Sequence, residues 1–216
     1  PPMHIFFDAY GTLLDVHSAA ARNEALLGPD WVTISETWRT RQLEYAWVAT
    51  LTGRYETFWT LTGRALDVAL AIGGRGGDPA LREALLAAYT DLTPFADVHP
   101  ALQKLREAGE TLSVLSNGDP DMLERALGAA GLLEVFDQVL SVDEARCFKP
   151  DPRAYRVAEA RLGVPAAEMR FVSSNPWDAA GSASHGFQAY WINRAGRPRE
   201  YPDVAGVNAI DTLLAL

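Results

Sequence analysis

The chain has 216 residues, of which 48% are hydrophobic and 22% are charged, which is typical of a globular enzyme and excludes a disordered or collagen-like chain. Its 19 basic and 28 acidic residues give a net charge of −9 without any basic run, so nucleic acid and anionic membrane surfaces are poor partners. We expect no membrane partner of any kind, because the sequence shows neither a bilayer-length apolar stretch nor a secretory signal.

The single cysteine, Cys147, excludes an internal disulfide framework and a multi-cysteine metal site. Neither His99 nor His185 is close to it in the sequence, so we interpret it as a half-buried thiol without a chemical role. A lone cysteine is typical of a reducing compartment, and we therefore expect a cytoplasmic protein.

Short apolar runs of strand length alternate with helical patterns over most of the chain. The first run, His4–Phe7, ends at Asp8 and a glycine turn. The later runs are Thr111–Leu115, Gln138–Ser141, Arg170–Val172 and Ala189–Ile192. The helical patterns between and after them are Pro100–Ala108, Pro120–Ala130, Pro152–Leu162 and Trp177–His185. This alternation predicts an α/β fold with a Rossmann-like, doubly wound parallel sheet.

The stretch from 16 to 95 has a different pattern. It contains no convincing strand, and its helical patterns are Trp38–Leu51, Tyr55–Ile72 and Pro79–Tyr89. Because it lies between the first strand and the next, we interpret it as an inserted helical cap. The predicted domains are a core of residues 1–15 and 96–216 and a cap of residues 16–95.

Polar side chains gather at the predicted carboxyl ends of the strands, which is where open α/β sheets bind their ligands. They are Asp8, Thr12, Ser116, Asn117, Ser173, Ser174, Asn175 and Asp178, with Lys149 just before Pro150. Each residue alone could cap a turn or face solvent. Their joint occurrence at one edge of the sheet predicts a functional site.

Four segments match, in order and spacing, the motifs of the haloacid dehalogenase superfamily. They are Asp8–Leu13, Ser116–Asn117, Lys149–Pro150 and Ser173–Asp178, and they extend over nearly the whole chain. The sequence therefore resembles this superfamily, which implies its α/β core and an aspartate nucleophile at Asp8.

Two departures narrow the resemblance to the L-2-haloacid dehalogenases. Phosphatase members carry a second aspartate two positions after the nucleophile, where this chain has Tyr10. They also carry acidic metal ligands in the last motif, where this chain has Ser174 and Asn175 and keeps only Asp178. Both departures remove groups that phosphoryl transfer with magnesium needs.

The segment Trp38–Tyr45 resembles the dehalogenase cap helix, in which the arginine after the tryptophan reaches the active site. That residue is Arg39 here. A solvated helix-face arginine is the commoner case, but an acidic protein needs a local cation for an anionic substrate. Tyr155 also matches the family pattern, although an aromatic residue on such a helix is more often part of the core.

The resemblance implies a mechanism in two displacements. Asp8 attacks C2 of a small L-2-haloacid from behind the carbon–halogen bond and forms an ester, so the product is a D-2-hydroxyacid with inverted configuration. Water then attacks the ester, and Asp178, with Asn175, orients and deprotonates that water. Lys149 serves either Asp8 or the substrate carboxylate, and the sequence leaves both open. The remaining polar residues assigned to fixing the carboxylates are Thr12 and Ser173.

The same resemblance implies the binding residues. Arg39 and Asn117 are expected to donate to the departing halide, and Ser116 to hold the substrate carboxylate. The apolar walls are assigned to Tyr10, Leu43, Phe58 and Trp177. No metal or organic cofactor is implied, because the nucleophile is already charged and the halide leaves without a proton.

Two other functions compete with dehalogenation. One is a magnesium-dependent phosphatase of the same superfamily, which the missing carboxylates disfavour. The other is a non-catalytic binding protein that has kept the fold, which the presence of Asp8, Lys149 and Asp178 disfavours. The resemblance and the apolar cap helices also predict a homodimer.

Overall fold

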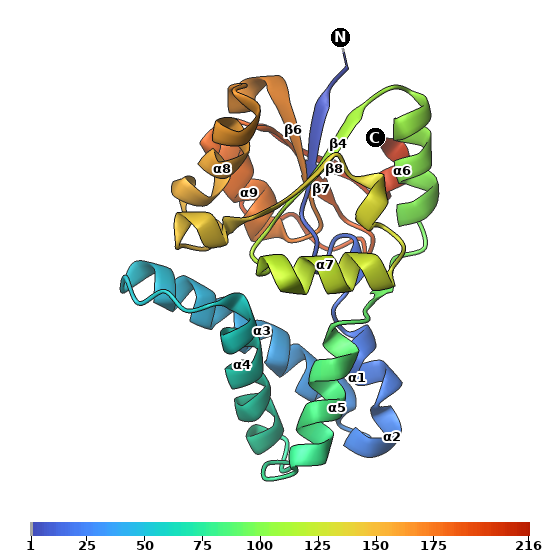
Figure 1. Cartoon of the computed structure of the whole chain (residues 1–216), viewed down its shortest axis with the longest axis vertical. Coiled ribbons are helices and arrows are strands. Elements are labelled where there is room, and N and C mark those ends of the chain that lie inside the picture. The colour runs from blue at the N-terminus through green and yellow to red at the C-terminus, as the bar shows by residue number, and fades with distance from the viewer. Residues whose placement is uncertain (1) are drawn as a thin grey trace.

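The computed structural model describes residues 2–216. It contains a six-stranded sheet in the order β5-β4-β1-β6-β7-β8, and every neighbouring pair in it is parallel. The strands are β1 His4–Phe7, β4 Thr111–Ser116, β5 Gln138–Ser141, β6 Met169–Ser173, β7 Gln188–Ile192 and β8 Val207–Ile210. The flanking helices are α6 Val98–Glu107, α7 Pro120–Ala129, α8 Pro152–Leu162 and α9 Pro176–His185 (Figure 1). The predicted α/β fold is confirmed.

The central strand β1 is short, but its burial on both faces explains why its apolar run can be recognised in the sequence. It pairs with β4 on one side and β6 on the other, and Ile5, Phe6 and Phe7 are fully buried. A parallel strand covered on both faces needs this continuous apolar run. The outer strand β8 was not predicted, because its central residues, Asn208 and Ala209, are exposed and the strand lacks a buried pattern.

Three short 3-10 helices lie in connections between strands: η1 Leu133–Val135, η2 Val142–Ala145 and η3 Ala166–Glu168. A fourth, η4 Leu213–Ala215, follows β8. Proline occupies the first turn of three core helices, at Pro120, Pro152 and Pro176, where a missing N–H leaves no hydrogen bond unmade. The helix predicted from Pro100 begins slightly earlier, at Val98.

Five helices between β2 and β3 gather below the sheet (Figure 1). They are α1 Ser18–Arg22, α2 Glu24–Leu27, α3 Trp31–Leu51, α4 Phe58–Ile72 and α5 Pro79–Tyr89. Helix α3 extends well before the predicted start at Trp38, and the short α1 and α2 were missed. Helix α4 begins at Phe58 instead of Tyr55, because Thr57 is its N-cap and accepts a hydrogen bond from the Thr60 N–H.

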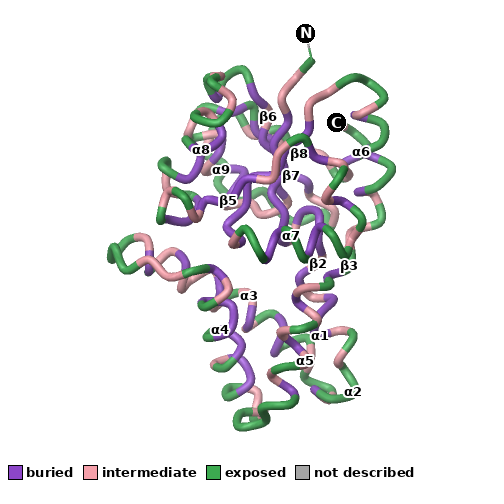
Figure 2. Tube along the Cα trace, viewed as in Figure 1, coloured by how far each residue is buried: buried purple, intermediate pink, exposed green. Residues whose placement is uncertain are grey.

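A small antiparallel ribbon lies where the helical segment joins the sheet (Figure 2). It pairs β2, Leu14–Asp15, with β3, Thr93–Pro94. The expectation of no strand between 16 and 95 was therefore wrong for β3. Two residues carry too little pattern to be recognised, and the ribbon exists only because the chain leaves and re-enters the core at neighbouring points.

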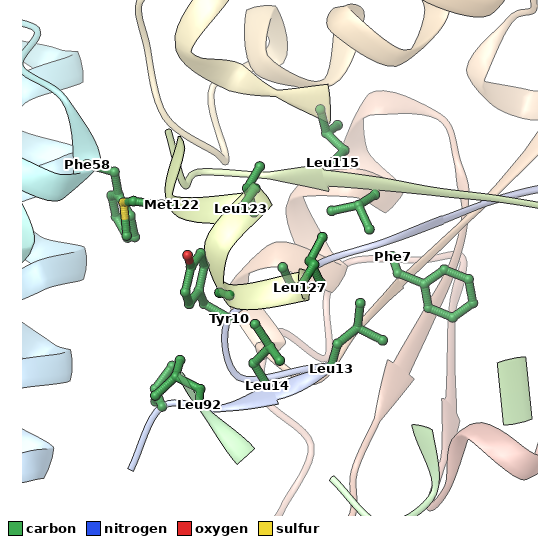
Figure 3. Packing of buried hydrophobic residues seen from close by; sticks show 14 of the residues in the cluster. Phe7, Tyr10, Leu13, Leu14, Phe58, Leu92, Leu115, Met122, Leu123 and Leu127 are labelled. Atoms are coloured by element: carbon green, nitrogen blue, oxygen red, sulfur yellow. The ribbon is translucent and has the colours of Figure 1, made fainter. Parts of the chain in front are cut away.

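The hydrophobic core continues from the sheet into the helical segment. Figure 3 shows Tyr10, just after β1, on the side of the core that faces Phe58 of α4. The Tyr10 ring lies 6.2 Å from that of Phe58 and stacks on Tyr89 of α5 at 5.5 Å.

Cys147 is fully buried, so the expectation of a half-buried thiol was wrong. Among residues 2–216, no helix combines the length and apolarity needed to cross a bilayer.

Candidate active site

Asp8 stands at the carboxyl end of the central strand and is 4% exposed. Its Oδ1 accepts a hydrogen bond from Lys149 Nζ at 2.9 Å. Its Oδ2 accepts from the Thr12 hydroxyl at 2.8 Å and from Asn175 Nδ2 at 2.7 Å, with the Ser173 hydroxyl at 3.4 Å. Each oxygen of the Asp8 side chain therefore accepts from at least one donor.

The turn after Asp8 depends on Gly11. Its φ is +87°, a backbone conformation that favours glycine. A Cβ at this position would also stand 3.3 Å from both Arg39 Nη2 and Asn175 Oδ1. Glycine therefore lets two side chains from distant parts of the chain approach the backbone beside Asp8.

Lys149 is fully buried and joins two carboxylates. Besides its contact with Asp8, its Nζ donates to Asp178 Oδ2 at 2.7 Å and to the Leu115 carbonyl at 3.2 Å, so the ammonium has three acceptors. Burial alone would lower the pKa of Lys149, but Asp178 and then Asp8 outweigh it and the net pKa is raised. The two carboxylates therefore favour the charged form of Lys149.

Asp178, on α9, is fully buried on the far side of Lys149. Its Oδ1 accepts from the Tyr155 hydroxyl at 2.7 Å. Burial raises the pKa of Asp178, and the Lys149 ammonium opposes that rise. Burial and the charge of Asp178 raise the pKa of Tyr155, so its phenol stays protonated and can donate. Tyr155 thus orients the second carboxylate instead of serving only as core.

Arg39 reaches this edge of the sheet from α3. Its Nη2 donates to the Tyr10 carbonyl and to Asn175 Oδ1, both at 3.1 Å, and its Nη1 donates to Gln42 Oε1 at 2.9 Å. The side-chain amide of Asn175 links Arg39 to Asp8, because its oxygen accepts from Arg39 and its nitrogen donates to Asp8. Residues from the helical segment and the sheet are therefore brought into one hydrogen-bonded group.

A cavity of about 430 Å³ opens beside this group. Of the predicted site residues, Arg39, Leu43, Ser174, Asn175 and Trp177 line it. Phe58, by contrast, is 1% exposed and is packed against Tyr10 and Phe148.

Ser116 and Asn117, at the end of β4, contact the loops around the site. The Ser116 hydroxyl accepts from the Gly118 N–H at 3.1 Å, and Asn117 Oδ1 accepts from the Lys149 N–H at 2.9 Å. Both side chains are almost fully buried. Their assignment to the substrate carboxylate and the halide stays a prediction.

Sequence reasoning missed Arg194, which ties several site loops together. Its Nη1 donates to the Ser174 hydroxyl and its Nη2 to the Thr12 carbonyl, both at 2.9 Å, while Nε and Nη2 pair with Asp97. Arg194 follows the predicted strand Ala189–Ile192, so the rule that polar residues at carboxyl strand ends form the site would have found it. Gln42 and Tyr89 were also missed, because a polar residue inside a helical pattern carries no comparable signal.

The oxygen atoms of this site are already matched to N–H and O–H donors, which does not suit the magnesium ion that phosphatases of this superfamily bind. The Lys149 ammonium stands between Asp8 and Asp178, and Asn175 turns its amide nitrogen to Asp8. Mg²⁺ needs several oxygen ligands in octahedral geometry. Among residues 2–216, no group of three or more His, Cys, Asp or Glu side chains could hold a metal ion. The residues present do not fit magnesium.

Comparisons with known proteins agree with this geometry. The model of the haloacid dehalogenase-like hydrolases matches residues 2–186. The chain is 47% identical over 195 residues to (S)-2-haloacid dehalogenase 4A of Burkholderia cepacia, covering 90% of this chain and 84% of that protein. The crystal structure of a dehalogenase superposes with a TM-score of 0.95 at 43% identity, over 98% of this chain and 94% of that one.

A further solved structure is the L-2-haloacid dehalogenase of Xanthobacter autotrophicus with chloropropionic acid covalently bound. It is 35% identical with a TM-score of 0.90, over 99% of this chain and 96% of that one. The family model spans most of the sequence, and the two solved structures superpose on nearly all of this chain. This chain belongs to the haloacid dehalogenase-like hydrolases.

Proposed function

We propose that this protein hydrolyses small L-2-haloacids to D-2-hydroxyacids through an ester on Asp8. The observation that carries the proposal is the buried Asp8 carboxylate, held between Lys149 on one oxygen and Thr12 and Asn175 on the other. The dehalogenase names of the similar proteins support the same chemistry.

The unequal surroundings of the two Asp8 oxygens assign their roles. Oδ2 faces the donors of Thr12, Asn175 and Ser173, whereas Oδ1 faces Lys149 alone. Oδ1 is therefore the freer nucleophile. It forms a bond to C2 as the carbon–halogen bond breaks on the opposite side, and the halide leaves with the bonding electron pair. Attack from behind inverts C2.

The second step breaks the ester by adding water to the side-chain carbonyl carbon of Asp8. Negative charge then builds on Oδ2, where Thr12 and Asn175 already donate, as preorganised donors do in an oxyanion hole. Asp178 takes a proton from the water, and Tyr155 and Lys149 hold it in position. The bond between Cγ and Oδ1 then breaks, and Oδ1 leaves on C2 as the product hydroxyl with one water proton. The water oxygen stays on Asp8, and the other proton leaves to solvent.

The halogen and the carboxylate of the substrate are proposed to bind on the side of the site that faces the cavity. Arg39 and Asn117 meet the departing halide, and Ser116 with nearby backbone N–H groups meets the substrate carboxylate. Leu43 and Trp177, which line the cavity, form the apolar wall with Tyr10 and Phe58 behind them. We propose that residues 16–95 act as a cap on a core of residues 1–15 and 96–216, because α3 of the helical segment supplies Arg39.

We propose further that the chain acts as a homodimer in the cytoplasm. Apolar side chains on the helices of the proposed cap support the dimer, since Val48, Leu51 and Ile72 are 51%, 86% and 62% exposed. Light scattering on the purified protein tests the assembly, and a monomer at micromolar concentration contradicts it. The lone buried cysteine supports a reducing compartment, which cell fractionation tests.

The test of the function is chloride release from L-2-chloropropionate without added metal, with chiral analysis of the lactate formed. We expect D-lactate, and hydrolysis of an aryl phosphate with Mg²⁺ in place of chloride release would contradict the proposal. Single-turnover samples analysed by mass spectrometry then separate the steps. We expect the Asp8 ester to accumulate in Asp178→Asn but hardly in Arg39→Ala.

The matched control is Arg41→Ala on the same helix. Arg41 pairs with Glu44 at 2.6 Å and its side chain is 39% exposed, so its removal should leave both steps unchanged. Equal accumulation of ester in Arg39→Ala and Asp178→Asn would contradict the division of roles between them.

A further inference from the structure

We propose that Gln42 is a positioning residue that acts through Arg39, holding its guanidinium against the Tyr10 carbonyl and Asn175 for the departure of the halide. The proposal rests on the proposed function, because it assigns Gln42 to the halide-releasing step. Gln42 follows Arg39 on the same face of α3, three residues later, and it is 1% exposed.

The contacts of Gln42 fix the direction of its amide. Its Oε1 accepts from Arg39 Nη1 at 2.9 Å, and its Nε2 donates to Thr62 Oγ1 at 2.8 Å and to the Tyr89 hydroxyl at 2.9 Å. The Thr62 hydroxyl donates its own proton to the Phe58 carbonyl at 2.7 Å, so towards Gln42 it can only accept. A guanidinium can only donate. A flipped amide would set donor against donor, and the oxygen must therefore face Arg39.

Through these contacts, two further helices help to fix the position of Arg39. Thr62 belongs to α4 and Tyr89 to α5, so Gln42 ties the helix that carries Arg39 to both neighbours. Tyr89 also stacks on Tyr10, whose carbonyl accepts from Arg39 Nη2. The guanidinium is thus held at Nη1 by the cap helices and at Nη2 by the loops of the sheet.

Packing alone does not account for a glutamine at this position. Its neighbours in the interior include the rings of Trp38 and Tyr89, and an apolar side chain of the same length would avoid burying an amide. Buried amides are hydrogen-bonded, and here one of those bonds ends on the cation that meets the halide. The arrangement therefore aligns Arg39 before the substrate arrives.

The chemical consequence is confined to the first displacement. A donor misplaced by about 1 Å can cost about a hundredfold in rate, so a loosened Arg39 should slow ester formation by about ten- to a hundredfold. Chloride, the poorer leaving group, needs that donor more than bromide does. Loss of alignment should therefore slow the chloro-substrate more than the bromo-substrate, whereas a general folding defect slows both equally.

The experiment compares Gln42→Met with Ser35→Ala, which removes the hydrogen bond that another buried side chain of α3 makes to His17 Nδ1. Ester formation is followed in single turnovers of L-2-chloropropionate and L-2-bromopropionate, with thermal unfolding as the measure of folding. We expect Gln42→Met to lower the chloro rate about tenfold or more and to raise the bromo-to-chloro ratio. Ser35→Ala should leave that ratio as in the wild type.

The same substitution is then made in an Arg39→Lys background. Because Gln42 acts through Arg39, the second change should alter the remaining rate less than twofold. Equal losses in both backgrounds, or an unchanged bromo-to-chloro ratio in Gln42→Met, would overturn the proposal. If Gln42→Met does not fold, Tyr89→Phe removes one of its anchors and keeps the ring, and must show the raised ratio in smaller measure. A wild-type protein that releases no halide would instead refute the proposed function.

Discussion

Replacement of Lys149 by methionine tests the electrostatic design of the site. Methionine keeps much of the length of the fully buried side chain but removes the ammonium between Asp8 and Asp178. Removing one partner of a buried ion pair costs about 3–5 kcal/mol, because the other charge is left without compensation. In Lys149→Met, two carboxylates lose their cationic partner. Uptake of a proton by one of them keeps the loss of stability within about that same range.

The expected shift in melting temperature follows from the size of the chain. For domains of about this length, 1 kcal/mol corresponds to about 2–4 °C, so Lys149→Met should melt roughly 6–20 °C below the wild type. The raised pKa of Lys149 means that its contribution is present across neutral pH and is lost only at high pH. Burial raises the pKa of Asp178, so ionisation of this group as the pH rises lowers the stability of the folded variant. The gap to the wild type should therefore be wider at pH 8 than at pH 5.

The assay is thermal unfolding followed by circular dichroism at both pH values. Lys104→Met is the matched control, because Lys104 is exposed on α6 and the same substitution there removes no buried charge partner. The double variant Lys149→Met/Asp178→Asn should recover part of the lost stability, since it removes one of the uncompensated carboxylates. The reasoning is refuted if Lys149→Met is as stable as the wild type, or if the double variant is no more stable than Lys149→Met.

Three further outcomes are expected. Asp8→Asn should abolish turnover, because an amide is too weak a nucleophile; a folded variant with wild-type halide release, shown by mass spectrometry to be unreverted, would contradict the mechanism. Chelation by EDTA should leave halide release unchanged, since the oxygens of the site face N–H and O–H donors; a loss that Mg²⁺ restores would contradict this. Ester hydrolysis should fail as pH falls through the raised pKa of Asp178, because the base must be ionised; single-turnover rates that stay constant down to about pH 4 would argue against Asp178 as the base.

Five strands of the sheet, and the edge at which the polar residues meet, can be predicted from the amino-acid sequence without any coordinates. Buried parallel strands need continuous apolar runs, so β1, β4, β5, β6 and β7 could be read directly. Their carboxyl ends lie together whatever the detailed packing, which brings Asp8 and Asp178 to one place. The outer strand β8 and the ribbon strand β3 could not be predicted, because an exposed or two-residue strand has no pattern to recognise.

Which atoms are in contact at that edge depends on how the chain packs. Lys149 lies 141 residues from Asp8 in the chain, and only the fold shows that one ammonium serves both Asp8 and Asp178. The division of donors between the two oxygens of Asp8 and the anchoring of Arg39 by Gln42 likewise depend on how separate helices and loops pack. Periodicity places a side chain on a face, but a hydrogen bond needs two atoms about 3 Å apart, and that is set by contacts between segments distant in sequence.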